Sequence, residues 1–150
     1  MALDITIRSL TEDDQLHWYQ MWNAYLYFYE TSVTEEVSRT AFSRLLSSEP
    51  GEFQGVIAEV DGKPFGLTHF LFHRFLCLVE DTYYLMDLFA DPSVRGQGVG
   101  RALIKSVYEA VKATGIPSVY WITQEFNYNG RMLYDQVAKR TPFIVYEKHD

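Results

Sequence analysis

The chain has 150 residues, of which 47% are hydrophobic, and this suits a single globular domain over residues 1–150. Its net charge of -7 excludes non-specific nucleic-acid binding, which depends on clustered Lys and Arg, so we expect no nucleic-acid partner. No apolar run reaches the roughly 18 residues of a membrane-spanning helix, and residues 1–10 lack a signal-peptide pattern, so we expect a cytoplasmic protein without a membrane partner.

The first elements expected in chain order are a strand at residues 4–10 and a helix from residue 11 to about residue 29. Thr11 and the three acidic residues after it are typical of a helix N-terminus. Four aromatic residues recur along one face of this helix: Trp18, Trp22, Tyr25 and Tyr29. Their spacing favours packing in the core, and we expect part of the stripe to line a pocket.

A second helix and a β-hairpin are expected next. Thr34 suits the N-cap of a helix over residues 35–47. Asp61-Gly62 is a strong signal for a two-residue turn, here between strands at residues 53–60 and 63–73. Acidic residues lie at the junction of the two helices: Glu30, Glu35 and Glu36. This cluster is compatible both with a solvated helix start and with recognition of a cationic amine.

Two candidate chemical groups on or near the second hairpin strand are expected to be inert. His69 and His73 are four residues apart and share a face, but no Asp, Glu or Cys completes a metal ligand set at a recognisable spacing, so we expect no metal. Cys77 is the only cysteine, which excludes an internal disulfide and suits a reducing compartment. Its apolar neighbours, residues 75–79, favour a buried, unreactive thiol.

The segment 91–101, Asp-Pro-Ser-Val-Arg-Gly-Gln-Gly-Val-Gly-Arg, follows an apolar strand at residues 83–90 and opens an amphipathic helix. Glycines let the backbone approach a ligand, and the free N–H groups and dipole of a helix start attract anions. The dinucleotide fingerprint would require glycine where Arg101 stands, and a phosphate-binding P-loop would require Gly-Lys-Ser/Thr. We therefore expect a phosphate or pyrophosphate site of another kind.

Arg95, Gly98 and Gly100 match the pattern Arg/Gln-x-x-Gly-x-Gly/Ala, which resembles the coenzyme A pyrophosphate motif of the GNAT superfamily of N-acetyltransferases. A strand is expected at residues 118–123, parallel to the strand at 83–90 because a helix crosses between them. Asn127-x-x-Gly-x-x-Leu133-Tyr134 then resembles the second superfamily signature. The aromatic first helix and the C-terminal end resemble the group of the yeast histone and polyamine acetyltransferase and its bacterial relatives.

The resemblance implies an α/β GNAT fold, a mostly antiparallel mixed sheet with a splayed parallel strand pair flanked by helices. It implies acetyl-CoA as co-substrate, with the side chains of Gln97 and Val99 nearly free to vary. The implied cofactor-binding residues are Leu88, Phe89, Ala90, Arg95, Gly96, Gln97, Gly98, Val99, Gly100, Arg101, Asn127 and Asn129. The backbone of the first three would hold the pantetheine arm and polarise the thioester carbonyl.

Transfer of acetyl to an amine also requires acid and base chemistry. The resemblance assigns Tyr134 as the general acid for the departing thiolate. The superfamily's relay carboxylate would fall at position 86, which is Met86, so Asp87 and Glu30 are the candidate bases. In a regular strand Asp87 would turn to the opposite face from Met86. Residues expected to border the acceptor are Trp22, Tyr25, Tyr29 and Glu30.

We therefore expect an acetyl-CoA-dependent N-acetyltransferase that acts by direct transfer in a ternary complex. A polyamine-like small amine, an amino acid, and a protein lysine or N-terminus all remain possible acceptors. The alternative is a non-catalytic acyl-CoA-binding sensor or regulatory module. We also expect a homodimer, and a final strand at residues 142–148 that pairs at the sheet edge or is exchanged with a second subunit.

Overall fold

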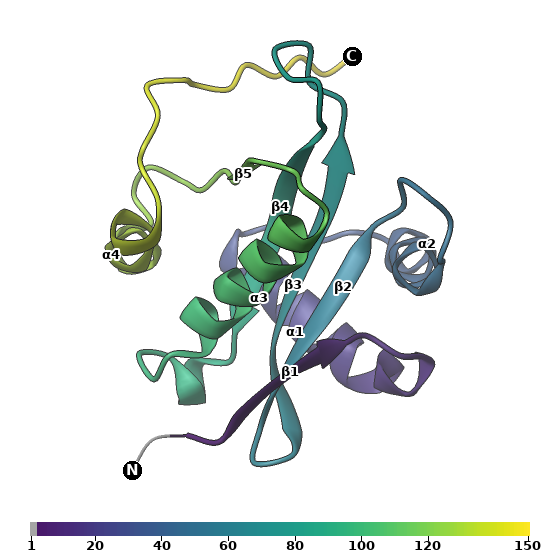
Figure 1. Ribbon diagram of the computed structural model, residues 1–150. Coiled ribbons are helices and arrows are strands. Elements are labelled where there is room, and N and C mark those ends of the chain that lie inside the picture. Colours follow the sequence, from purple (N-terminus) through teal and green to yellow (C-terminus); the bar gives the residue numbers. More distant parts are fainter. Residues whose placement is uncertain (1–2) are drawn as a thin grey trace.

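A five-stranded mixed sheet, in the order β1-β2-β3-β4-β5, forms the centre of the computed structural model, which describes residues 3–150 (Figure 1). Neighbouring strands are antiparallel except β4 and β5. The strands are β1 (Ile5–Ser9), β2 (Gln54–Val60), β3 (Lys63–His73), β4 (Thr82–Ala90) and β5 (Val119–Tyr120). The helices are α1 (Gln15–Phe28), α2 (Glu35–Leu46), α3 (Val99–Ala113) and α4 (Tyr128–Val137), with 3-10 turns η1 (Glu12–Asp14) and η2 (Pro92–Val94). The predicted fold class is confirmed.

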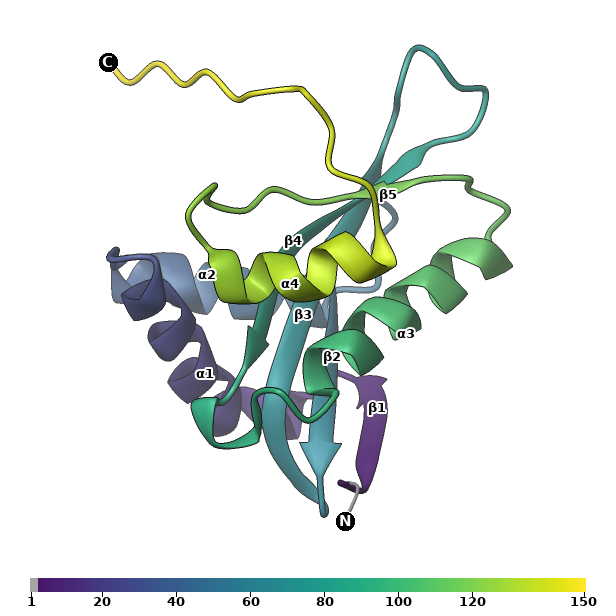
Figure 2. The same ribbon diagram turned by 90° about the vertical axis from the view of Figure 1, so that its left-hand side faces the viewer.

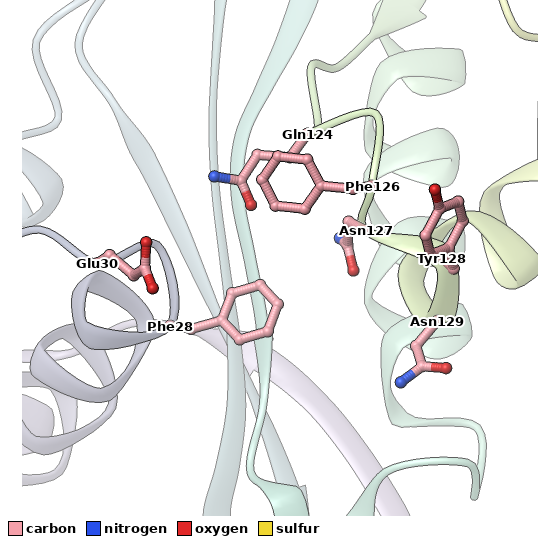
Figure 3. Close-up of a pocket in the computed structure, with 7 residues that line it drawn as sticks. All are labelled: Phe28, Glu30, Gln124, Phe126, Asn127, Tyr128 and Asn129. Atoms are coloured by element: carbon pink, nitrogen blue, oxygen red, sulfur yellow. The ribbon is translucent and has the colours of Figure 1, made fainter.

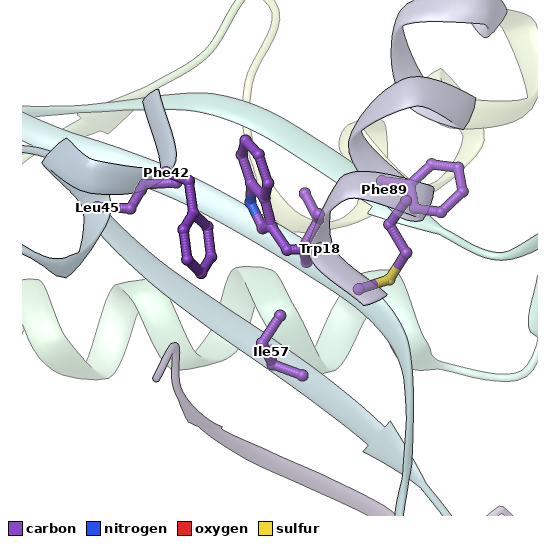
Figure 4. Packing of buried hydrophobic residues seen from close by; sticks show 7 residues of the cluster. Trp18, Phe42, Leu45, Ile57 and Phe89 are labelled. Atoms are coloured by element: carbon purple, nitrogen blue, oxygen red, sulfur yellow. The ribbon is translucent and has the colours of Figure 1, made fainter. Parts of the chain in front are cut away.

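Helices cover both faces of the sheet, with α1 and α2 on one side and α3 on the other, and α4 beside α3 (Figures 1 and 2). On the first face Trp18 is fully buried among residues of α2, β2, β3 and β4, including Phe42, Ile57 and Phe89 (Figure 4). On the opposite face Val107 and other apolar residues of α3 pack on the sheet. Burial of two apolar faces is the main stabilising term of such a three-layer fold.

The β2–β3 hairpin has the turn that its sequence predicts. Asp61 and Gly62 both have positive φ, 51° and 83°, as a two-residue primed turn requires. Further along β3, Gly66 lets α3 approach the sheet closely, because an added Cβ would lie 2.9 Å from Val99 Cγ1 and 3.0 Å from the Phe89 carbonyl oxygen. Val99 is itself almost fully buried there, so the expectation of a freely variable side chain at 99 is wrong.

The parallel pair β4 and β5 is held by two residue pairs only, Tyr83 with Val119 and Tyr84 with Tyr120. The chain then leaves the sheet, and the predicted strand at 118–123 is reduced to β5. Within residues 3–150, no strand lies beside β4 beyond Tyr84 on this edge. The splayed pair that the sequence predicts is present, and it leaves an open edge of backbone on β4.

Contacts between side chains of α4 and α3 hold the two helices together beside the open edge of β4. Leu133 lies so close to Gly100 that an added Cβ at Gly100 would be 3.2 Å from Leu133 Cδ2. The Tyr108 hydroxyl donates to the Val137 carbonyl at 3.1 Å, and Arg101 donates to the side chain of Gln136. These contacts fix the position of α4 relative to the start of α3.

Two predictions about exposed segments fail in the single chain. Residues 142–148 do not pair at the sheet edge, and Phe143 and Tyr146 are 86% and 88% exposed, because β5 ends too early to offer this tail a strand edge. Exchange of this segment with a second subunit, the other alternative, stays a prediction. Cys77 is exposed rather than buried, because the β3–β4 connection protrudes beyond the sheet (Figure 1). None of the helices in residues 3–150 has the length and hydrophobicity needed to cross a membrane.

Candidate active site

The start of α3 offers a set of unpaired backbone donors. Gly96 and Gly98 have φ of 76° and 95°, a conformation that favours glycine, and Gly98 is the N-cap of α3 without a side-chain cap. The first helical bond runs from the Ala102 N–H to the Gly98 carbonyl, so the N–H groups of the first turn have no intrahelical partner. Free N–H groups and the dipole of a helix start favour the binding of an anion.

The side chains of this loop turn to other parts of the protein. Arg95 Nε donates to the Ala90 carbonyl at 2.9 Å, and its guanidinium lies over the rings of Phe28 and Phe89, 5.6 and 5.8 Å from their centroids. Gln97 Nε2 donates to the Ser93 carbonyl at 3.3 Å. An anion at the start of α3 would therefore meet mainly backbone N–H groups, as the sequence predicts.

A groove leads from this loop past the end of α1 to the start of α4. One depression, of about 390 Å³, is bounded by Phe28, Glu30, Phe126 and the first residues of α4 (Figure 3). A second depression is bounded by Phe28, Glu30, Pro92 and Arg95. The two depressions are neighbours that share Phe28 and Glu30, and together they are called the groove. Figure 3 shows Phe28 and Phe126 extending toward one another from opposite sides of the groove.

Glu30 has a left-handed backbone, with φ of 56°, at the end of α1. The Glu30 N–H donates to the Tyr27 carbonyl at 2.9 Å, and the Thr31 N–H to the Leu26 carbonyl at 3.0 Å, which is the bond pattern of a Schellman motif. Glycine is the favoured residue at this position, and a residue with Cβ costs about 1 kcal/mol or more. The chain thus keeps a carboxylate in the groove at a cost in stability.

A β-bulge in β4 decides where Asp87 points. The pairing of β3 with β4 passes from His69 with Asp87 to Phe70 with Leu85, so Met86 is the extra residue. In a regular strand Asp87 would share the face of Leu85, which packs beneath α3. The bulge instead turns Asp87 toward His69 on the α1 face.

Asp87 is part of a buried chain of polar contacts. Its Oδ2 lies 2.9 Å from His69 Nδ1, and His69 Nε2 accepts from Trp18 Nε1 at 2.9 Å. Sequence reasoning considered His69 only as a metal ligand and missed this role. The signal available was a polar ring in an apolar strand, since a buried imidazole requires partners.

The other expected metal candidate also has a different role. His73 Nε2 lies 2.8 Å from the Tyr120 hydroxyl and its Nδ1 lies 2.8 Å from the Arg74 carbonyl oxygen. Among residues 3–150, no three His, Cys, Asp or Glu side chains lie together in a way that could hold a metal ion.

The aromatic stripe of α1 divides between core and site. Trp18 is core, and Trp22 Nε1 donates to Ser38 Oγ of α2 at 3.2 Å. Tyr25 and Tyr29 continue the stripe, with ring centroids 5.0 Å apart. Burial, and next the charge of Asp87, raise the pKa of Tyr25, which places its phenol beside that carboxylate.

Tyr134 approaches the same region from α4. Its ring is edge-on to Trp121 at a centroid distance of 5.5 Å. Burial, with a smaller contribution from Tyr29, raises the pKa of Tyr134 to about 12. The phenol thus remains protonated at neutral pH and can act as a hydrogen-bond donor near Tyr29 and the Asp87 side of the gap.

Asn127 and Asn129 lie at the start of α4, where both line the groove. The Asn127 side chain caps α4 by accepting from the Gly130 N–H at 3.3 Å, and its Nδ2 donates to Thr123 Oγ1 at 3.0 Å. An added Cβ at Gly130 would lie 2.5 Å from Asn127 Nδ2, so glycine at 130 leaves room for the cap. Asn127 therefore holds the departing end of the splayed strand.

The arrangement of an anion-binding helix start, a splayed strand pair and a phenol from α4 can be compared with known families. The family model described as Acetyltransferase (GNAT) family matches residues 10–138. The chain belongs to this family. The predicted family, and with it the class of acetyl-CoA-dependent N-acetyltransferases, is confirmed.

Two named acetyltransferases resemble the chain, one over nearly its whole length and one over about half of it. The D-amino-acid N-acetyltransferase HPA3 of Saccharomyces cerevisiae is 30% identical over 146 residues, which cover 97% of this chain and 91% of the yeast protein. A thialysine N-epsilon-acetyltransferase of Caenorhabditis elegans is 30% identical over 83 residues, 55% of this chain and 51% of that protein.

Solved structures share the fold at lower sequence identity. The aminoglycoside N-acetyltransferase AAC(6')-Iy, solved in complex with CoA, has a TM-score of 0.85 at 16% identity, with 99% of this chain and 97% of that chain covered. A ribosomal-protein-alanine N-acetyltransferase of Brucella melitensis biovar Abortus 2308 has a TM-score of 0.76 at 17% identity, with 97% and 99% covered. Such likeness establishes the fold.

The amide donors at the start of α3 yield a direct prediction. Gly98→Asp should weaken coenzyme A binding by at least about tenfold, because it places a carboxylate against the phosphates. Gly98→Asn has the same size without the charge and should lose less affinity. Isothermal titration calorimetry with coenzyme A measures both.

Gly115→Asp is the matched control for backbone strain. Gly115 has φ of 78° at the other end of α3, and an added Cβ there meets nothing within 4 Å. This variant should lose stability to a similar degree but bind coenzyme A as the wild type does. Equal affinity of the Gly98→Asp variant and the wild type would contradict the proposed anion site.

Proposed function

We propose that the protein transfers acetyl from acetyl-CoA to the primary amine of a small molecule, with amino acids as the first candidates, by direct transfer in a ternary complex. The observation that supports this most is the lining of the groove, in which Arg95 lies shortly before the backbone donors at the start of α3, Glu30 lies at the end of α1 and Asn127 lies at the start of α4. The pyrophosphate would bind those donors, and the pantetheine arm would follow the open edge of β4.

The acceptor must lose a proton before it attacks. An alkyl ammonium with a pKa near 10.4 is neutral in about one part in two thousand at pH 7, which costs roughly 4.6 kcal/mol. Asp87 is the proposed base, because the bulge turns its carboxylate into the buried region beside Tyr25. The ammonium first releases one proton to water. The neutral nitrogen then forms its bond to the acetyl carbon, and the second proton that it loses as the amide forms passes to this carboxylate, directly or through water, while the C–S bond breaks and coenzyme A leaves as the thiolate.

The thiolate of coenzyme A must be stabilised as the C–S bond breaks. With a pKa of about 12, the Tyr134 phenol is a weaker acid than a thiol of pKa near 8.5, so its main contribution is a hydrogen bond to the developing thiolate. Backbone groups of Leu88 and Ala90 face the open edge of β4, where N–H groups can polarise the thioester carbonyl, whereas those of Phe89 face Leu67 of β3.

Several features favour a small amine as the acceptor. The depression at the start of α4 has a volume of about 390 Å³, which falls in the range of small-molecule sites. Glu30 lines it and carries a negative charge that attracts an ammonium group. Trp22, Tyr25 and Tyr29, which the sequence also predicts to border the acceptor, are not among the residues that line the groove. The yeast relative named as a D-amino-acid N-acetyltransferase, similar over 97% of this chain, supports amino acids among small amines.

A thiol-release assay with acetyl-CoA tests the proposal. The acceptor panel should contain D- and L-amino acids, diamines, aminoglycosides and a lysine peptide. We expect turnover with a small amine, highest with an amino acid. Coenzyme A binding without turnover on any acceptor would favour the alternative, a non-catalytic acyl-CoA-binding sensor or regulatory module.

Removal of the Tyr134 hydroxyl should slow the chemical step. Tyr134→Phe is expected to lower kcat by roughly ten- to a thousandfold with little change in acetyl-CoA affinity. Because a phenol of pKa about 12 stays protonated, wild type and variant should show the same pH dependence of kcat between pH 6 and 9. Steady-state kinetics and calorimetry measure these effects, and an unchanged kcat would remove Tyr134 from the mechanism.

Replacement of Glu30 should separate stability from substrate binding. Glu30→Gly relieves the left-handed strain and should raise the free energy of unfolding by up to about 1 kcal/mol, while KM for a cationic amine rises about three- to tenfold. Glu30→Gln keeps the strain and should raise KM alone. Urea unfolding and kinetics measure the two effects.

Asp61→Gly is the control for strain relief, since Asp61 has φ of 51° in the distant hairpin turn. It should leave KM unchanged. A wild-type KM in both Glu30 variants would show that this carboxylate does not contact the acceptor.

The exposed tail supports the further proposal of a homodimer in which a second subunit covers residues 142–148. The side chains of Phe143, Ile144, Val145 and Tyr146 are 64–88% exposed in the single chain. Light scattering should give twice the 17.5 kDa mass of one chain, and Ile144→Asp should shift it toward the monomer. A monomeric wild type would contradict the proposal.

A further inference from the structure

Both ring nitrogens of His69 are used in the buried interior. The ring lies between Trp18 of α1 and Asp87 of β4, and the residue is 4% exposed. Trp18 Nε1 and His69 Nε2 are 2.9 Å apart, and His69 Nδ1 and Asp87 Oδ2 are 2.9 Å apart. The three side chains form one line of contacts from the core to the candidate base.

The indole of Trp18 determines which nitrogen of His69 carries the proton. An indole N–H can only donate, so Nε2 must accept and cannot itself carry a hydrogen. The hydrogen of the neutral ring is therefore on Nδ1, from which it is donated to Asp87 Oδ2. A second proton on Nε2 would face the indole N–H and remove that bond.

We propose that His69 is a positioning residue, which Trp18 keeps neutral and in its Nδ1–H form. In this form His69 fixes the Asp87 carboxylate and leaves that carboxylate its negative charge for proton transfer. This inference rests on the proposed role of Asp87 in acetyl transfer. If the imidazole were protonated, it would form an internal ion pair with Asp87, and the carboxylate would be a poorer base. The indole N–H works against that outcome.

The surroundings of Asp87 fit this assignment. Tyr25 of α1 and Tyr84 of β4 lie near enough that the Asp87 charge contributes, after burial, to the raised pKa of both phenols. Both phenols are neutral at pH 7, so His69 is the one ring whose protonation would cancel the Asp87 charge. Residues from three elements thus converge on one carboxylate.

The state of the His69 ring can be measured without any substrate. Long-range proton–nitrogen NMR spectra of uniformly labelled protein distinguish a protonated from an unprotonated ring nitrogen, and the His69→Asn variant identifies the His69 signals among the four histidines. We expect Nδ1 protonated and Nε2 unprotonated. In Trp18→Phe, which keeps an aromatic ring in the core, Nε2 should become protonated in part of the molecules.

A matched pair of variants isolates the bond from His69 to Asp87. His69→Asn places an amide N–H about where Nδ1–H lies, while His69→Leu has no donor. Both remove the acceptor of the Trp18 N–H, so the structural loss is shared. We expect His69→Leu to lower kcat about ten- to a hundredfold with KM for acetyl-CoA changed less than about twofold, and His69→Asn to recover most of kcat.

Asp87→Asn distinguishes failure of this inference from failure of the proposed base. If Asp87→Asn is inactive while His69→Leu keeps wild-type kcat, the positioning role is overturned and the base is retained. If Asp87→Asn is as active as wild type, both the role of Asp87 as the base and the positioning role of His69 are overturned. An Nε2-protonated ring in the wild type, or equal losses in His69→Asn and His69→Leu with equal thermal melting, also overturns the inference.

Discussion

Two residue pairs hold β5 to β4, and the gap beyond them is the constraint on which the site depends. A parallel strand continued along β4 would occupy the backbone groups that border the groove and would move α4 away from α1. Because the pairing stops at Tyr84, the edge of β4 stays open, and Tyr134 of α4 lies near Tyr29 at the end of α1. Because β5 is so short, the C-terminal tail has no strand edge with which to pair.

The candidate chemistry is concentrated where regular structure is interrupted. The bulge at Met86 reverses the direction of Asp87, glycines with positive φ open the start of α3, and Glu30 ends α1 in a left-handed conformation. Interruptions of this kind reduce stability, and they persist where the surrounding packing fixes them. Here the packing is supplied by the aromatic residues of α1 and by the contacts between α3 and α4.

Core and site are joined through Trp18. Its ring lies at the centre of the cluster between α1, α2 and the sheet (Figure 4). Its N–H donates to His69, the ring that contacts Asp87. A buried N–H without an acceptor would cost about 1–3 kcal/mol, so the same bond that serves the candidate site also satisfies the core. A single residue can in this way connect stability and chemistry.

The sequence by itself determined what depends on local patterns. Asp61-Gly62 specified the hairpin turn, and the glycine-rich segment with Arg95, Gly98 and Gly100 specified both the conformation of the helix start and the family. The spacing of Trp18, Trp22, Tyr25 and Tyr29 specified one helix face. Turn chemistry and periodicity act over a few residues, and a sequence displays them directly.

Only the tertiary structure decided the direction of Asp87, the role of His69, and the exposure of Cys77 and the C-terminal tail. Residues 142–148 have the composition of a strand, but a strand forms only where a neighbouring edge is available. The bulge in β4 likewise comes from its pairing with β3, and one extra residue reverses every side chain that follows. Such outcomes depend on contacts between distant segments, which no local pattern encodes.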